Sequence, residues 1–376
     1  MLFSEVIGHA TLKSKLLNNL KSGKISHAQL FLGETGFGTL AMALAYAQYV
    51  NCTNPGENDS CGVCDSCSKM MALTHPDLHF SFPVITKKAG SKPVSADYID
   101  EWRKTIFDNP YIDYAQWMQI IEAENKQGNI TAEECREIIK KLSLKPMYDG
   151  YKVLIIWLPE YMGKEGNILL KTLEEPSPKT LIILVAENEE NILQTILSRT
   201  QLQRISGINF DDLQASLMKK LDQGADEAGR ITHLSDGNYN TALRLFEAEE
   251  NNYTEEFIKW MRACFKPDMP VVLKWVETMA TTGRENQKNF LLYSIGILRE
   301  CLLQNQGINQ LNHLLESEKD FASKFSAWIG PDNIAELNEA FSTAHYHIER
   351  NAHPKILFFN LSLLVNEQLG RYRKRA

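Results

Sequence analysis

Residues 29–40, with the sequence QLFLGETGFGTL, decide the fold of this chain. The short apolar run 29–32 precedes a glycine-rich turn, and residues 40–50 contain neither glycine nor proline, which favours a helix. Gly33 and Gly38 stand at the spacing of the two glycines in the phosphate-loop pattern GxxxxGK(S/T). Backbone N–H groups of such a loop and helix can bind phosphate. The order strand, glycine loop and helix therefore predicts a phosphate-loop scaffold.

This loop lacks the side chains that ATP hydrolysis requires. The chemistry needs a lysine for the β- and γ-phosphates and a hydroxyl for Mg²⁺, but these two positions hold Thr39 and Leu40. A carboxylate should also follow the strand-like run 153–156, where Trp157 stands instead. We therefore expect no intrinsic ATPase activity and interpret the loop as a glycine turn kept for strand–helix packing. The residues of this degenerate loop are Gly33, Gly36, Gly38 and Thr39.

Two later apolar runs predict buried parallel strands. Residues 152–157 and 180–186 are rich in β-branched and aliphatic side chains, and a helical segment, NILLKTLEE, lies between them. A capping-box pattern at residues 131–134 predicts the start of another helix. From about residue 209 the strand signals stop and the remaining sequence favours helices. The N-terminal part is therefore predicted to be a three-layer α/β domain.

Length and composition limit the classes of function. A chain of 376 residues is too long for one hydrophobic core and predicts two or three domains. Its formal net charge of −7 gives it no basic field to hold DNA alone, so other subunits would supply most of that charge. The sequence shows neither a leader pattern at its start nor an apolar run of about 18 residues. We expect a cytoplasmic protein with no membrane partner.

Four of the seven cysteines fall within sixteen residues. They follow the pattern C-x8-C-x2-C-x2-C, which places three thiolates close together and lets the first return as a fourth ligand. In a reducing cytosol such a cluster indicates a metal before a disulfide. We expect a structural Zn²⁺, with a redox or disulfide role as the alternative and His75 as a possible substitute ligand. The predicted ligands are Cys52, Cys61, Cys64 and Cys67.

Taken in order, these pieces resemble the delta-prime subunits of the bacterial DNA polymerase III clamp loader, a family of AAA+ proteins. The resemblance covers most of the chain. It rests on SHAQLFLGETGFG, the cysteine module, HPD at residues 75–77, ITAEECREIIKKL, KVLIIWLPEYM, NILLKTLEEPSPKTLIILVAEN and ILSRTQ, followed by LSDGNYNTAL and NAHPKILFFNLSLLV.

The resemblance implies roles for two further positions. In this family the segment matching Ser198-Arg199-Thr200 usually ends in cysteine, and its arginine reaches toward ATP on a neighbouring subunit. Arg199, with Ser198 beside it, is thus the candidate trans arginine finger. Without the resemblance, an arginine in this position would most often be a surface or salt-bridging residue. Asn240 stands where ATP-binding relatives carry a nucleotide-sensing arginine.

We therefore expect an AAA+ α/β base (residues 1–208) with an embedded zinc module (52–67), a helical lid (209–250) and an all-α collar (251–376). An insertion at about 78–129 would form either a small extra core or a partner surface. The resemblance implies a non-hydrolysing stator that joins gamma/tau-like ATPase subunits and a delta-like subunit to load the sliding clamp onto primed DNA. The alternatives are an ATP-hydrolysing motor subunit and a zinc-containing adaptor outside replication.

Overall fold

The computed structural model describes residues 1–87, 90, 92–123, 126–221, 224–249, 253–266, 268–308, 314, 316–350 and 352–373. They form two compact units. The first comprises Met1–Ser216 and Asp236–Asn240, and the second comprises Leu217–Ser235 and Thr241–Ala376. The three-domain division at residues 208 and 250 stays a prediction.

The first unit is built on a five-stranded parallel sheet in the order β2-β3-β4-β1-β5. Its strands are β1 (Ala28–Leu32), β2 (Leu78–Ser81), β3 (Lys152–Trp157), β4 (Thr180–Ala186) and β5 (Gln201–Arg204). The parallel sheet and the strands predicted at β1, β3 and β4 are confirmed. Because β1 lies inside the sheet, the glycine loop that follows it sits at the carboxyl edge, between neighbouring strands.

Two strands were not predicted. β2 occupies the first residues assigned to the insertion, which therefore leaves the sheet only after Ser81. β2 pairs only with β3, and β5 only with β1, so both are edge strands of four residues. Three of the four residues of β5 are exposed. Edge strands this short carry too little periodic signal to be distinguished from loops.

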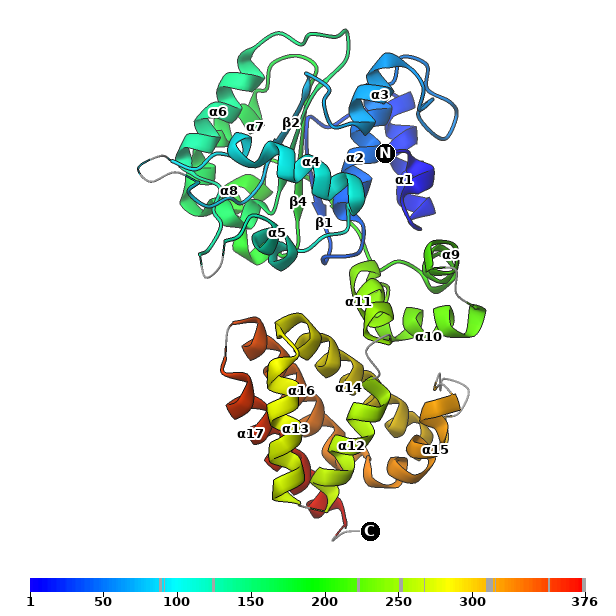
Figure 1. The fold of residues 1–376 in the computed structure, drawn as a ribbon. Helices are drawn as coiled ribbons and strands as arrows, with labels where there is room; N and C mark the ends of the chain where they lie inside the picture. The colour runs from blue at the N-terminus through cyan, green and yellow to red at the C-terminus, as the bar shows by residue number, and fades with distance from the viewer. Residues whose placement is uncertain are drawn as a thin grey trace. The chain divides into compact units, whose positions relative to one another are not determined.

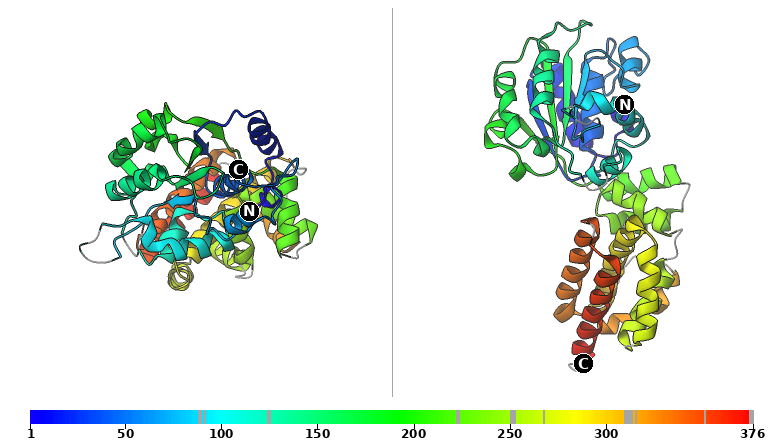
Figure 2. Two further views of the ribbon diagram at one scale, coloured as in Figure 1. Left: turned by 90° about the horizontal axis from the view of Figure 1, so that it is seen from above. Right: turned by 60° about the vertical axis from the view of Figure 1, so that its left-hand side comes forward.

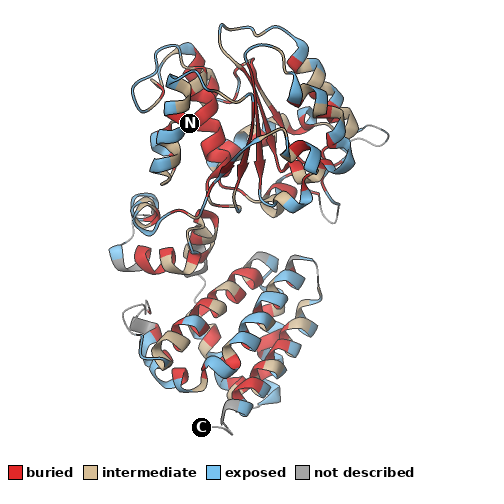
Figure 3. Ribbon diagram, turned by 180° about the vertical axis from the view of Figure 1, so that it is seen from behind, coloured by how far each residue is buried: buried red, intermediate tan, exposed pale blue. Residues whose placement is uncertain are grey.

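Helices cover both faces of this sheet (Figures 1 and 2). On one face α2 packs with the ring of Tyr46 against Phe31. On the other, alternate strand residues such as Leu30 and Leu184 form a core with α6 to α8. The strands β1, β3 and β4 and helix α2 are almost entirely buried (Figure 3). The α-helices are α1 (Ala10–Lys21), α2 (Thr39–Val50), α3 (Asp65–Met71), α4 (Ile99–Asp108), α5 (Tyr114–Ile120), α6 (Ala132–Ser143), α7 (Leu170–Glu174) and α8 (Gln194–Leu197), and the 3-10 helices are η1 (Phe3–Glu5), η2 (Ser95–Tyr98), η3 (Pro159–Leu169) and η4 (Glu189–Asn191).

Helix α6 begins where the sequence predicts, but with half of the expected cap. The side chain of Thr131 accepts a hydrogen bond from the N–H of Glu134 at 3.3 Å, which confirms the N-cap. The Glu134 carboxylate does not return to the Thr131 backbone. It accepts the N–H of Ser95 at 2.8 Å instead, so this buried glutamate fastens the insertion to the base.

The second unit is all-helical and holds its own aromatic core. Trp260 and Trp275 stack at 4.5 Å, and Trp260 also donates a 2.8 Å hydrogen bond to the Ser362 hydroxyl. Apolar side chains from residues 257–264, 290–301 and 358–369 all contribute to this core. Its helices are α10 (Ala225–Ser235), α11 (Tyr239–Glu249), α12 (Tyr253–Phe265), α13 (Met269–Thr281), α14 (Arg284–Asn305), α15 (Glu316–Phe325), η6 (Ser326–Trp328), α16 (Pro331–Glu349) and α17 (Pro354–Arg373). Helix α9 (Phe210–Leu221) is divided between the units after Ser216, and the first two residues of α11 belong to the first unit.

A buried ion pair ties α10 to this helical core. Arg230 donates to Glu318 at 2.6 Å, and both side chains are at most 4% exposed. The Tyr293 hydroxyl donates to the same carboxylate oxygen at 2.7 Å, which helps to offset the cost of desolvating the two charges. Within the described part of the chain, we find no helix with the length and apolarity needed to cross a membrane.

Candidate functional site

The glycine loop is closely packed against two other segments of the first unit. A Cβ on Gly33 would overlap the carbonyl oxygen of Ile205, just after β5, and one on Gly36 would overlap the side chain of Asn238. Gly36 and Gly38 also have φ of +82° and +91°, a conformation that favours glycine. These contacts explain the loop's glycines without any bound phosphate.

The space at the mouth of the loop is filled by the protein itself. The cavity between the loop and the ends of β3 and β4 has a volume of only about 10 Å³, roughly enough for one water molecule. Thr39, Leu40 and Trp157 line it, all at most 7% exposed. The insertion closes the same cavity with residues 110–112. A nucleotide could enter only if this packing were disrupted.

Tyr111 is the main closing side chain. Its ring packs so tightly on the loop that a Cβ at Gly38 would lie 3.0 Å from Cε1 of Tyr111. Its hydroxyl accepts the N–H of Ile7 at 3.0 Å, and its ring centroid lies 4.8 Å from that of Tyr239. This burial raises the pKa of the Tyr111 hydroxyl, which therefore remains neutral. Tyr111 falls within the predicted insertion, and no local pattern in the sequence indicates its position at the loop.

The insertion also holds Asn240, the residue in place of a nucleotide-sensing arginine. Asn240 donates to the side-chain oxygen of Gln116 at 3.0 Å and to the Asp113 carboxylate at 3.3 Å. Asp113 is at the same time the N-cap of α5 and accepts the N–H of Gln116 at 2.7 Å. Asn240 is thus positioned by the chain's own polar side chains.

The surroundings of the loop are acidic. The Thr35 hydroxyl donates to the Glu187 carboxylate, and Glu160 accepts the N–H groups of Glu187 and Asn188 at 2.6 and 2.8 Å. Desolvation, and then the charges of Glu160, Asp113 and Glu34, raise the pKa of Glu187 to about 7, despite the opposing hydrogen bond from Thr35. Desolvation likewise raises the pKa of Glu160. Such a field repels the phosphates of a nucleotide.

The aromatic residues of the insertion form a small core of their own. Trp102 and Trp117 are fully buried and meet edge to face at 5.2 Å. Phe82 stacks on Trp102 at 4.2 Å, and the ring of Trp157, at the end of β3, lies 5.2 Å from that of Trp102. The insertion is predicted from the sequence to form either a small extra core or a partner surface, and these ring contacts are those of a core. Phe107 is 75% exposed and does not belong to this core.

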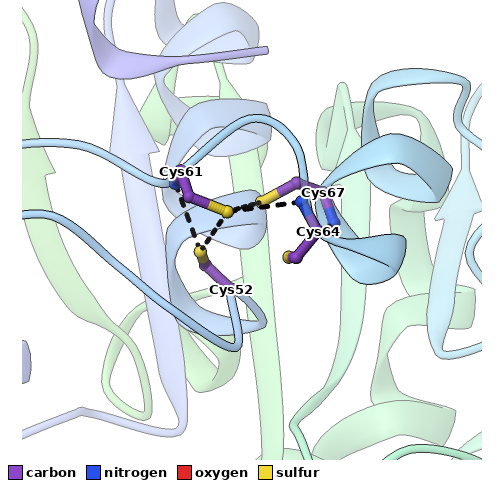
Figure 4. Close-up of side chains that lie close together, drawn as sticks. All are labelled: Cys52, Cys61, Cys64 and Cys67. Atoms are coloured by element: carbon purple, nitrogen blue, oxygen red, sulfur yellow. Dashed lines mark hydrogen bonds between the residues drawn. The ribbon is translucent and has the colours of Figure 1, made fainter.

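The four clustered cysteines converge, as the sequence predicts (Figure 4). Their sulfur atoms all lie within 4.8 Å of one another, with 3.5 Å between those of Cys52 and Cys61. Sulfurs at the corners of a tetrahedral zinc site would be about 3.8 Å apart. Backbone N–H groups of Cys61, Cys64 and Cys67 point at sulfurs of the same cluster at 3.3 to 3.4 Å, which favours thiolates. The group can therefore hold a metal ion.

The predicted alternative ligand, His75, lies outside this cluster. Its Nδ1 accepts the N–H of Asp77 at 3.2 Å, and its ring packs on Tyr148. Asp77 in turn accepts the N–H groups of Met147 and Tyr148 at 2.8 and 2.9 Å. The Tyr148 hydroxyl donates to Asp65, on the helix that follows Cys64. The HPD segment thus fastens the cysteine module to the sheet.

Arg199 lies in the turn between α8 and β5 and is held by its own chain. Its guanidinium pairs with Glu174 at the end of α7, with a distance of 2.6 Å from Nε to the carboxylate, and it donates to the Thr195 carbonyl oxygen at 2.8 Å. The Ser198 hydroxyl is exposed and accepts a bond from Arg199 at 3.2 Å. Arg199 does not line the cavity at the glycine loop. The structure therefore does not bring Ser198 and Arg199 to this loop, and the predicted finger role is untested.

The N-terminal part of the chain matches a known protein family. Residues 8–209, more than half of the chain, match the family described as "DNA polymerase III, delta subunit". The matched segment contains the glycine loop, the cysteine module, the insertion and Arg199.

Individual relatives carry related names. The chain is 24% identical over 303 residues to DNA polymerase III subunit delta' of Escherichia coli (strain K12), covering 80% of this chain and 77% of that protein. The delta' subunit of Pseudomonas aeruginosa is 25% identical over 225 residues, covering 58% of this chain and 56% of that protein. The tau subunit of Salmonella typhimurium is also 24% identical, covering 65% of this chain but only 32% of that longer protein.

The position of Glu187 predicts a pH-dependent effect of its removal. Because the folded pKa is raised to about 7 from the ordinary 4.5, the ionised carboxylate destabilises the fold progressively as pH rises from about 4.5 to 7. Glu187→Gln should therefore raise the free energy of unfolding at pH 8 and leave it nearly unchanged at pH 4. Urea denaturation at both pH values measures this, with Glu190→Gln as the matched loss of an exposed carboxylate. A Glu187→Gln variant that is less stable than the unmodified chain at pH 8 would contradict the assignment.

Proposed function

Because the chain belongs to the DNA polymerase III delta-subunit family and is a delta-prime-like clamp-loader subunit, we propose that it is a stator that does not hydrolyse ATP. It would join gamma/tau-like ATPase subunits and a delta-like subunit in the ring that loads a sliding clamp onto primed DNA. The observation that carries this proposal is the closed glycine loop, where about 10 Å³ remains for any ligand.

Percentage identity alone does not separate this proposal from an ATP-hydrolysing motor subunit, since the delta' and tau relatives are both 24% identical. The delta' match extends further, however, covering 80% of this chain against 65% for tau. The loop residues separate the two. Thr39 cannot replace an ammonium at the transferring phosphoryl group, and Trp157 cannot help to bind Mg²⁺. The acidic Glu187 adds a repulsive charge at the same place. An adaptor outside replication is disfavoured by the match to a DNA polymerase III family.

We propose further that Arg199 is an arginine finger acting on ATP bound by a neighbouring motor subunit. A guanidinium is always charged and presents several donors in a fixed fork, which suits charge spread over γ-phosphate oxygens. In the isolated chain this group is only 32% exposed and is bound to Glu174. Surface ion pairs of this kind contribute about 0–1 kcal/mol, so exchanging Glu174 for a phosphate costs little. Glu174 would thus keep the finger in place until the ring assembles.

Arg199→Ala should lower ATP turnover by the assembled clamp loader and slow clamp loading. The loss at the one affected site should be about 10³-fold or more, while sites completed by other subunits continue to work, so total turnover falls only in part. Steady-state ATPase and clamp-loading assays on the reconstituted complex measure this. Assembly, followed by size-exclusion chromatography, and metal content should be unchanged.

Two variants separate the finger from a merely structural arginine. Glu174→Gln breaks the same ion pair but keeps the guanidinium, so the complex should hydrolyse ATP at least as fast as the unmodified one. Arg204→Ala removes an arginine from a similar exposed pair, at 2.9 Å from Glu189, and should have no effect. If Glu174→Gln impairs turnover as much as Arg199→Ala does, the ion pair is structural and the finger role is wrong.

For the cysteine cluster we propose one structural Zn²⁺ held by Cys52, Cys61, Cys64 and Cys67. Four soft sulfur ligands leave no open position, so the ion would supply stability rather than catalysis. It would fix residues 51–64 between α2 and α3, which form neither a helix nor a strand.

The purified chain should contain one equivalent of zinc by elemental analysis. Cys61→Ser together with Cys64→Ser should abolish binding and lower the unfolding temperature, because metal binding contributes directly to the stability of such modules. Cys135→Ala removes a buried cysteine outside the cluster and should keep the full zinc content. A fully folded, metal-free protein would refute the zinc assignment, and stoichiometric binding of another metal would refute its identity.

A further inference from the structure

The helical unit carries an aromatic groove lined by residues of α12, α15 and η6 and by Lys266. Its volume is about 380 Å³, within the range of roughly 300–1,000 Å³ that small binding sites occupy. Its lining combines buried Met261 and Phe325 with the half-buried rings of Phe265, Phe321 and Trp328. The groove could therefore accept one further large apolar side chain beside these rings.

The rings that line the groove are fixed by contacts with one another. Phe265 and Trp328 meet edge to face at 4.7 Å, while Phe321 and Phe325 stack at 4.9 Å. Phe321 also packs on Phe257 in the core beneath. Because these rings are already ordered, little side-chain entropy would be lost when a ligand binds between them.

The rim of this groove is positively charged, although the chain as a whole has a net charge of −7. Arg262, on α12, and Lys266, in the turn directly after it, are both exposed. The N–H of Lys266 still donates to the Arg262 carbonyl oxygen at 3.2 Å, so the two side chains keep a helical i, i+4 spacing at which like charges repel. In the described part of the chain neither has an ion-pair partner. Lys324, on the opposite wall, is paired with Asp320 at 2.7 Å. Binding of an anionic partner would therefore reduce the repulsion between Arg262 and Lys266.

These features favour a peptide over a nucleic acid. Single-stranded nucleic acids bind along grooves in which cations follow the backbone and successive bases stack on exposed rings. Here two free cations sit within one helical turn, a carboxylate lies on the opposite rim, and the rings are half-buried. We propose that this groove binds a short acidic peptide segment of a partner protein, with one aromatic or large aliphatic side chain inserted between the rings and carboxylates beside Arg262 and Lys266. This site is independent of the proposed stator function.

Fluorescence anisotropy on the full chain tests this with a labelled octapeptide that contains four aspartates and one central tryptophan. The peptide should bind saturably at low salt and more weakly at high salt, since the rim contacts are exposed. Replacing its aspartates by lysines, or its tryptophan by glycine, should abolish measurable binding. Arg262→Glu with Lys266→Glu should weaken binding about tenfold or more, which corresponds to 1.4 kcal/mol.

The matched control is Lys274→Glu with Lys355→Glu, which reverses two exposed cations of the same unit that do not line the groove. It should bind the peptide as the unmodified chain does. Equal binding of the acidic and basic peptides, or no effect of the reversals at 262 and 266, would overturn the proposal. Binding of oligothymidine that exceeds peptide binding and is lost in the same double variant would also overturn it, and would assign the groove to single-stranded DNA.

Discussion

The first unit depends on the close approach of three chain segments around the glycine loop. Gly33 and Gly36 allow β5 and the turn at residues 236–240 to pack where any side chain would overlap them. Tyr111 then covers Gly38 from the insertion. A cavity of only about 10 Å³ remains between the loop and these residues. The same glycines thus retain a structural purpose after the catalytic side chains are gone.

Charge supports the same account. Glu187 and Glu160 place carboxylates at the carboxyl ends of β4 and β3, where a nucleotide site would need positive groups. The arginine proposed to act on ATP lies elsewhere, in the turn before β5, bound to Glu174. This separation is compatible with the proposed stator role, in which Arg199 would act at a neighbour's site.

Much of this arrangement could be predicted from local patterns. The strands β1, β3 and β4 are continuous apolar runs, the cap at Thr131 is a short-range signal, and the cysteine spacing predicts the cluster of sulfurs. Tyr111 and Glu187 could not be assigned in this way, because their roles arise from contacts with residues more than seventy positions away. Glu134 is a similar case. The capping-box pattern predicts that its carboxylate accepts the N–H of nearby Thr131, but the carboxylate accepts the N–H of Ser95 from the insertion instead.

Titration of the isolated full chain with MgATP, followed by calorimetry, tests the central claim most directly. The account predicts no saturable binding up to about 1 mM, because the loop is filled, lacks its lysine and is surrounded by carboxylates. Tyr111→Gly should not restore binding, since the missing lysine and the acidic groups remain. One-to-one binding with a dissociation constant of about 1 μM, competed by ADP, would contradict the account and favour a nucleotide-binding motor subunit.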